Sequence, residues 1–315
     1  MYRLGIDLGG TKIEGAILNG TGEPIFRERF ATEQEKGYEH ILSQIKRLYD
    51  SMVEKIKSKP HSLGMGTPGA ISHRTGALKN SNTECLRGRF STGAVEKLLG
   101  HKVLLENDAN CFALAESLRG AAKGKDLVFG VIMGTGCGCG MVYQGKLLVG
   151  RQDIAGEWGH MSIDPNGPPC YCGARGCVET FISGGGLEKR YTKQFSEKLV
   201  LSEIVSRYRK GDGRATKFMK EFFIHFGRSV ANLINILDPD VIVLGGGVSN
   251  IKEIYTEGIE EVRRQVFSDS LETPIVKNKL GDSAGVIGAA PTSRYRPNER
   301  PTGAWPNGAA LLGIS

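Results

Sequence analysis

The densest cluster of reactive side chains in this sequence is a run of three cysteines. Cys170, Cys172 and Cys177 follow His160 by ten, twelve and seventeen residues. Thiols at this spacing, separated by glycines, can wrap one metal ion, and the upstream imidazole can complete a tetrahedron. Three buried thiols beside an unrelated histidine would be the alternative. Because a Cys3His set leaves no open coordination position, the pattern predicts a structural zinc ion that orders the loop and performs no chemistry.

Two acidic residues flank these expected ligands. Glu157 lies three residues before His160, and Glu179 lies two residues after Cys177. A loop ordered by a metal ion would hold both carboxylates in place, where they could bind the hydroxyl groups of a polyol. Ordinary surface acids are the alternative for both positions.

A third acid lies where a predicted strand runs into a predicted helix. The sequence there reads Glu106-Asn107-Asp108-Ala109-Asn110. Ligands gather at the carboxyl ends of strands in α/β sheets, so Asp108 could be a general base for a hydroxyl group. It could also be only the N-cap of the helix that follows.

Three glycine-rich turns could bind an anion. The first closes a strand and reads Asp7-Leu8-Gly9-Gly10-Thr11-Lys12. The second spans residues 134–140, with glycine at every other position, and the third is Gly245-Gly246-Gly247 between a strand and a helix. Backbone N–H groups in such turns point into one concavity that suits phosphate, and Asp7 could hold a hydrated Mg²⁺. Plain chain reversals remain the alternative for each turn.

Two common nucleotide-binding motifs are excluded. The sequence holds no G-x-x-x-x-G-K-[ST], so it has no P-loop. Residues 64–69 formally match G-x-G-x-x-G, but Pro68 and the loop-like sequence after it do not open a helix, as a dinucleotide site requires.

Composition narrows the class of protein. The chain has 315 residues, a net charge of +7 and 44 glycines, about twice the usual share of glycine. Lys and Arg are scattered, which argues against nucleic-acid binding. The N-terminus does not resemble a secretory signal, and no apolar run is long enough to cross a membrane. The seven cysteines fit metal ligands and free thiols in a cytoplasmic chain better than a disulfide framework.

Alternating apolar patterns and turn signals place these motifs on predicted elements. Strands are expected at 2–8, 12–18, 24–30, 62–65, 102–106, 126–133, 141–143 and 241–244, and helices at 38–56, 109–119 and 218–237. A strand, a glycine turn and a returning strand occur twice, at 4–18 and at 128–143. This internal repeat predicts two domains of similar topology whose glycine turns face one cleft.

Taken together, these motifs have the order and spacing of the ROK family of sugar kinases and repressors, and the sequence resembles that family from about residue 2 to residue 290. Lys79-Asn80-Ser81-Asn82, Cys170-Tyr171-Cys172-Gly173 and Glu179-Thr180-Phe181-Ile182 look most like the bacterial fructokinases of the manno/fructokinase type. They look somewhat less like the N-acetylglucosamine kinase branch.

The resemblance implies an α/β protein with the ribonuclease-H-like, actin-like ATPase fold of two-domain sugar kinases, with a cleft between the domains. A small N-terminal domain would span 1–120 and be joined by the C-terminal helix. A larger domain with the zinc loop would span 121–290. Residues 291–310 depart from the family pattern as a proline-rich insert. We interpret it as a tolerated surface insertion, and partial loss of activity is the alternative.

The resemblance also assigns roles to residues. Asp108 would be the catalytic base. Sugar hydroxyls would be bound by Asn82, Asn107, Asp108, Glu157, His160 and Glu179. ATP and Mg²⁺ would be bound by Asp7, Gly9, Gly10, Thr11, Lys12, Thr135, Gly136, Gly245, Gly246 and Gly247. Structural Zn²⁺ would be bound by His160, Cys170, Cys172 and Cys177.

The implied activity is the ATP-dependent phosphorylation of a hexose, with D-fructose converted to fructose 6-phosphate as the first expectation. A kinase for N-acetylglucosamine or N-acetylmannosamine, or a glucokinase, is the alternative enzyme. A sugar-responsive repressor is the alternative outside enzymology, but family repressors carry a helix-turn-helix before the first glycine motif, and here Gly5 and Asp7 begin at once. The resemblance further implies a homodimer in the cytoplasm, with no nucleic-acid or membrane partner.

Overall fold

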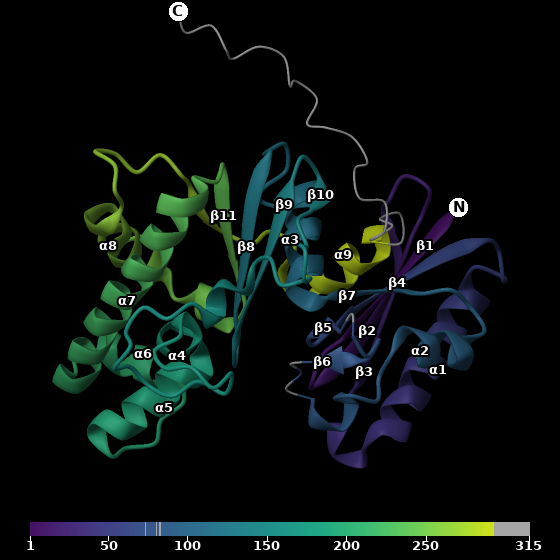
Figure 1. Cartoon of the computed structure of the whole chain (residues 1–315), viewed down its shortest axis with the longest axis horizontal. Coiled ribbons are helices and arrows are strands. Elements are labelled where there is room, and N and C mark those ends of the chain that lie inside the picture. The colour runs from purple at the N-terminus through teal and green to yellow at the C-terminus, as the bar shows by residue number, and fades with distance from the viewer. Residues whose placement is uncertain (73, 80, 82, 293–315) are drawn as a thin grey trace, which may run out of the picture.

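The computed structural model describes residues 1–72, 74–79, 81 and 83–292 (Figure 1). Asn82, an expected sugar contact, lies outside the described residues, as does the chain from residue 293 onward. Among the helices of the described residues, none is long and apolar enough to span a membrane.

The first half of the chain builds a five-stranded sheet in the order β3-β2-β1-β4-β7. Its strands are β1 (Tyr2–Leu8), β2 (Lys12–Leu18), β3 (Pro24–Ala31), β4 (His61–Thr67) and β7 (Leu104–Asn107). The first three strands are antiparallel, whereas β4 and β7 run parallel to β1. Helices α1 (Tyr38–Lys55) and α2 (Thr92–Leu99) contribute buried apolar side chains to the core of this half. A small hairpin, β5 (Ala70–Ile71) with β6 (Leu78–Lys79), stands apart from the sheet.

The second sheet repeats the same topology, in the order β10-β9-β8-β11-β12. Its strands are β8 (Leu127–Met133), β9 (Cys137–Tyr143), β10 (Lys146–Leu147), β11 (Val241–Gly245) and β12 (Ile275–Lys277). Here too an antiparallel trio is followed by two parallel strands. The repeat expected from the sequence is therefore confirmed, and it extends from the glycine turns to both whole sheets.

Helices fill the second part of the long connection between β10 and β11, after the loop that contains the three cysteines. They are α4 (Val178–Ile182), α5 (Gly184–Phe195), α6 (Leu201–Arg209) and α7 (Gly213–Leu237), and α8 (Glu257–Gln265) follows β11. The stripe of phenylalanines on α7, including Phe218, Phe222 and Phe226, is fully buried in the core of this half. A helix expected after Gly245-Gly246-Gly247 is one 3-10 turn (Gly247–Asn250), because Ile251 leaves the helical conformation.

Two helices connect the halves. Helix α3 (Asp108–Arg119) follows the first sheet in the chain yet packs closely on β8 and β9, where a side chain on Gly140 would lie 2.7 Å from the Ala109 carbonyl oxygen. Helix α9 (Ala284–Thr292) ends the described chain yet lies among the elements of the first sheet (Figure 1). A side chain on Gly5 would lie 2.3 Å from the Val286 carbonyl oxygen of α9. A domain boundary near residue 120 stays a prediction.

Candidate active site

Two adjoining cavities share Asp108 and Ile132 as wall residues. We call them the first cavity and the second cavity. Polar side chains of the first cavity are Asn107, Asp108, Thr135, Glu157, His160, Tyr171 and Glu179. The second cavity is lined by residues that include Asp7, Gly9, Lys12, Gly246, Gly247, Ser249, Lys277, Asn278, Lys279, Gly281 and Gly285.

The structure thus brings most of the expected site residues together. Thr135 and Gly136, expected near ATP phosphates, line the first cavity beside Asp108. Three expected nucleotide contacts, Gly10, Thr11 and Gly245, do not line either cavity. Gly245 instead faces Phe112 of α3, whose ring leaves no room for a side chain there, 2.6 Å from the position of a Cβ atom.

Asp108 is the first residue of α3, at the carboxyl end of β7. The N-cap is Asn107, whose Oδ1 accepts hydrogen bonds from the N–H groups of Ala109 at 3.0 Å and Asn110 at 3.3 Å. The interpretation of Asp108 as the cap is therefore wrong, since the preceding residue meets that need. Asp108 Oδ1 accepts from its neighbour Ala109 N–H at 2.8 Å.

Burial sets the protonation behaviour of this carboxyl group. It raises the pKa of Asp108 to about 6, the Ala109 N–H lowers it, and the negative charge of Glu157 raises it. A carboxylate with a pKa just below neutrality can accept a proton efficiently near pH 7. Asp108 therefore has the placement and the basicity of a general base.

Asp7 faces Asp108 across the second cavity. Its carboxyl group lies against Gly285 of α9, where a Cβ atom would be 2.4 Å from Asp7 Oδ2, and against Gly66 of β4. Burial, with a further contribution from Asp108, raises the pKa of Asp7 to about 7, and Lys12 opposes this shift. Two neighbouring buried carboxyl groups hold negative charge poorly unless a cation joins them. A divalent cation fits this arrangement.

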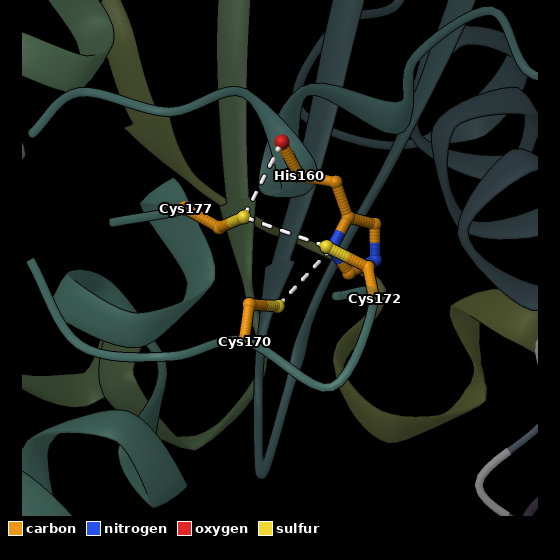
Figure 2. A group of neighbouring side chains, drawn as sticks. All are labelled: His160, Cys170, Cys172 and Cys177. Atoms are coloured by element: carbon orange, nitrogen blue, oxygen red, sulfur yellow. Dashed lines mark hydrogen bonds between the residues drawn. The ribbon is translucent and has the colours of Figure 1, made fainter. Parts of the chain in front are cut away.

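The expected zinc ligands converge (Figure 2). The ligand atoms of His160, Cys170, Cys172 and Cys177 all lie within 4.8 Å of one another. Cys172 Sγ is 3.6 Å from Cys177 Sγ, and Cys170 Sγ is 3.6 Å from His160 Nδ1. A tetrahedral zinc ion with bonds of about 2.0–2.3 Å holds its ligand atoms about 3.5–3.8 Å apart. The donor set therefore fits one closed zinc site.

The cysteine loop and the residues beside it border the first cavity through four side chains: Glu157, His160, Tyr171 and Glu179. His160 turns Nδ1 to the cysteines and Nε2 to the Tyr171 hydroxyl, 3.1 Å away. Glu157 Oε2 lies 4.0 Å from the same Nε2. Glu179 Oε2 accepts from the Cys137 N–H at 2.9 Å, and Glu179 Oε1 lies 3.9 Å from Cys170 Sγ. Both acids flanking the ligands thus lie in the cavity.

Sequence reasoning missed two parts of these walls. Tyr171 was assigned no role, although it lies between two expected ligands, and its hydroxyl group is 3.1 Å from His160 Nε2. Residues 277–281 were assigned no role, yet Lys277, Asn278, Lys279 and Gly281 line the second cavity. They follow a parallel strand at its carboxyl end, which is where ligands bind in α/β sheets, and this signal could have found them.

The repeated sheets, the packing of α3 and α9 between them, and an acid that lines two adjoining cavities define an α/β protein of the ribonuclease-H-like, actin-like ATPase fold. The model of the ROK family matches residues 3–294, and the chain therefore belongs to the ROK family.

Individual relatives agree with this assignment. N-acetyl-D-glucosamine kinase of Vibrio atlanticus is 37% identical over 296 residues, which cover 91% of this chain and 97% of that protein. The ROK hexokinase of Thermus thermophilus superposes with a TM-score of 0.82 at 32% identity, covering 92% of this chain and 97% of that one. A ROK glucokinase from Streptomyces griseus, solved with glucose and AMPPNP, has a TM-score of 0.77 at 28% identity over 93% and 99% of the chains. These relatives are sugar kinases, so they support a place for this chain among the sugar kinases of the family. They do not support the fructokinase branch in particular.

Proposed function

We propose that this protein transfers the γ-phosphoryl group of ATP to a primary hydroxyl group of a hexose. The observation that carries the proposal is the place of Asp108, whose carboxyl group lines both cavities. A base at that point can reach a hydroxyl group bound on one side and a phosphorus atom bound on the other. Solved relatives named as hexokinase and glucokinase support the same reaction class.

The first cavity suits a sugar. The carboxylates of Glu157 and Glu179 accept hydrogen bonds from hydroxyl groups, and His160 Nε2 adds a third polar contact. Asn107 uses Oδ1 to cap α3, which leaves its amide N–H groups to donate to a sugar oxygen. These contacts hold the hexose with its primary hydroxyl group toward Asp108.

The second cavity suits a nucleoside triphosphate. Lys12, Lys277 and Lys279 supply positive charge, and the glycine turn at Gly9 presents backbone to the phosphates. Gly247 lines this cavity and has no atom within 4 Å of its Cβ position, so an adenosine group can approach its backbone there. Asp7 would hold the hydrated Mg²⁺, which supplies neutralisation of phosphate charge when bound.

In the reaction, Asp108 accepts the proton of the primary hydroxyl group as its oxygen forms a bond to the γ-phosphorus. The bond between that phosphorus and the bridging oxygen of ADP breaks, and ADP leaves. Thr135 and Gly136 lie where they can bind the transferring group, since they line the cavity beside Asp108. The zinc loop orients His160 and Glu179 and contributes no step, because its four ligands close the site.

The favoured hexose is N-acetyl-D-glucosamine. The proposal for this substrate rests on two relatives named N-acetyl-D-glucosamine kinase, which are 37% and 38% identical to this chain over nearly their whole length. Fructose is the second candidate, because Cys170-Tyr171-Cys172-Gly173 and the sequence after Glu179 resemble fructokinases.

A panel of hexoses tests the proposal. ADP release would be measured with ATP and N-acetylglucosamine, N-acetylmannosamine, fructose, mannose or glucose, each at matched concentration. We expect sugar-dependent ADP release with the highest kcat/KM for N-acetylglucosamine. A higher value for fructose would move the substrate assignment to fructokinase, and no turnover with any hexose would contradict the proposed activity.

A further inference from the structure

Helix α3 carries a second acid, the buried Glu116, two turns after Asp108. Its side chain has no exposed surface. Burying a carboxylate is costly unless hydrogen bonds replace the lost water. Among the described residues no Lys or Arg forms an ion pair with Glu116, so its hydrogen bonds must meet that cost.

Three backbone N–H groups supply them. The N–H of Leu280 donates to Glu116 Oε1 at 2.8 Å, and the N–H of Ala121 donates to Oε2 at 2.7 Å. The N–H of Lys279 lies between the two oxygens, at 3.2 Å and 3.1 Å. A carboxylate suits this cradle because it only accepts hydrogen bonds. One side chain of α3 thereby fixes a loop more than 160 residues further along the chain.

That loop is a wall of the second cavity. Lys277, Asn278, Lys279 and Gly281 line it, opposite Gly9 and Lys12. The loop follows the edge strand β12 and precedes α9, and the Asn278 N–H donates to the Leu244 carbonyl oxygen at 2.9 Å. Glu116 therefore provides the anchor that ties the loop to the helix of the catalytic base.

We infer that Glu116 is a positioning residue for the nucleotide: it holds residues 277–281 at the distance from Asp108 that places bound ATP for transfer. The inference rests on the proposed function for the identity of the nucleotide. It adds a specific group, outside both cavities, that determines nucleotide affinity.

The glycine at the end of α3 agrees with this role. A Cβ atom on Gly120 would lie 2.0 Å from Glu116 Oε2 and 2.5 Å from its Cδ. Gly120 has φ of −103° and ψ of −141°, outside the main allowed regions for residues with a side chain, so a Cβ atom there would meet both backbone strain and Glu116. The absence of a side chain at residue 120 leaves the carboxylate in its cradle.

The test replaces the carboxylate by an amide of the same shape. In Glu116→Gln, one oxygen becomes an NH2 group that faces a backbone N–H, so part of the cradle is lost. The Kd of a non-hydrolysable ATP analogue would be measured by calorimetry, together with KM for ATP and for the sugar. We expect the Kd and the KM for ATP to rise about tenfold, with the KM for the sugar changed less than twofold.

Two further variants keep the test decisive. Gly120→Ala would displace the same carboxylate by a methyl group, and should weaken the ATP analogue in the same direction. Leu114→Ala removes a buried apolar side chain from the same helix without touching the cradle, and should lower Tm without raising that Kd.

Unchanged nucleotide affinity in Glu116→Gln and Gly120→Ala would overturn the inference. So would an equal loss of affinity in Leu114→Ala at the same loss of Tm. Because the calorimetric test needs no sugar, it remains informative if the wild-type protein binds the analogue but phosphorylates no hexose, in which case only the proposed function fails.

Discussion

At the scale of single residues, burial is the dominant influence on the two acids of the cleft. It raises the pKa of Asp7 to about 7 and that of Asp108 to about 6. The negative charge of Asp108 adds to the rise in the pKa of Asp7. The proposed proton acceptor, Asp108, and the proposed cation-binding carboxylate, Asp7, thus both have pKa values near neutrality.

The pH dependence of the proposed reaction follows from these values. Asp108 must be deprotonated to accept the hydroxyl proton, so kcat/KM should fall as pH drops below about 6 and level off on the alkaline side. Rates would be measured between pH 5 and 8 with saturating Mg²⁺. A profile that stays flat down to pH 5 would contradict the role of Asp108 as the base.

At the scale of elements, the cysteine cluster contacts two side chains, His160 and Glu179, that we propose bind the sugar. His160 and Glu179 come from short helical segments on either side of the three cysteines, and each contacts the cluster. We therefore predict that Cys172→Ser lowers zinc content from about one ion per chain toward zero and lowers kcat/KM for the sugar at least tenfold. Zinc would be measured by elemental analysis after dialysis.

Cys85→Ser is the matched control for this variant. Cys85 is a free cysteine of the first half, with its Sγ 3.8 Å from the Gln34 carbonyl oxygen and far from the cluster in sequence. It should retain one zinc ion and full activity. If Cys172→Ser instead remains active with no zinc bound, the cluster does not order the sugar site.

The sequence predicted the elements better than their contacts. Alternating apolar residues and glycine turns mark the strands of both sheets, because that pattern is local. To identify Asn107 as the N-cap, one must know that α3 begins at Asp108, one residue earlier than expected. The wall at 277–281 and its anchor Glu116 join segments far apart in the chain, so no local pattern could reveal them.

In the site, too, local patterns could be predicted from the sequence, whereas contacts between distant segments could not. The zinc ligands lie within eighteen residues of one another, so their spacing alone indicated a cluster, and the structure brings them together. The cleft between the repeats was foreseen, because two similar units with equivalent turns must meet along a shared surface. The packing of α3 on the second sheet could not be predicted. It depends on Gly130, Gly138 and Gly140, which lack side chains where α3 approaches the sheet. These glycines lie on two strands and form one surface only after the strands have paired.

At the scale of the whole molecule, α3 follows the first sheet in the chain but packs on the second, and α9 follows the second sheet but packs on the first. This exchange joins the halves and brings Asp7 and Asp108 to one cavity. Helix α9 brings Gly285 against Asp7, and Gly5 of β1 allows that helix to approach the sheet. We predict that Gly5→Ala, whose methyl group would lie 2.3 Å from the Val286 carbonyl oxygen, lowers the free energy of unfolding by about 1–3 kcal/mol and also lowers activity.

Urea denaturation and the kinase assay would measure both effects. Gly20→Ala is the control, because no atom lies within 4 Å of its Cβ position and its φ is not in the left-handed region. Wild-type stability in Gly5→Ala would show that α9 does not need this close approach.

The most direct test of the central claim is Asp108→Asn. Asparagine keeps the size of the side chain and an oxygen that can accept from the Ala109 N–H, but it cannot take a proton from a hydroxyl group. Calorimetry and single-turnover kinetics with ATP and the best hexose of the panel would separate binding from chemistry. We expect sugar affinity within a few-fold of wild type and a phosphoryl-transfer rate lower by about 10²–10⁴-fold. Transfer at near wild-type rate in Asp108→Asn would contradict the role of Asp108 as the general base.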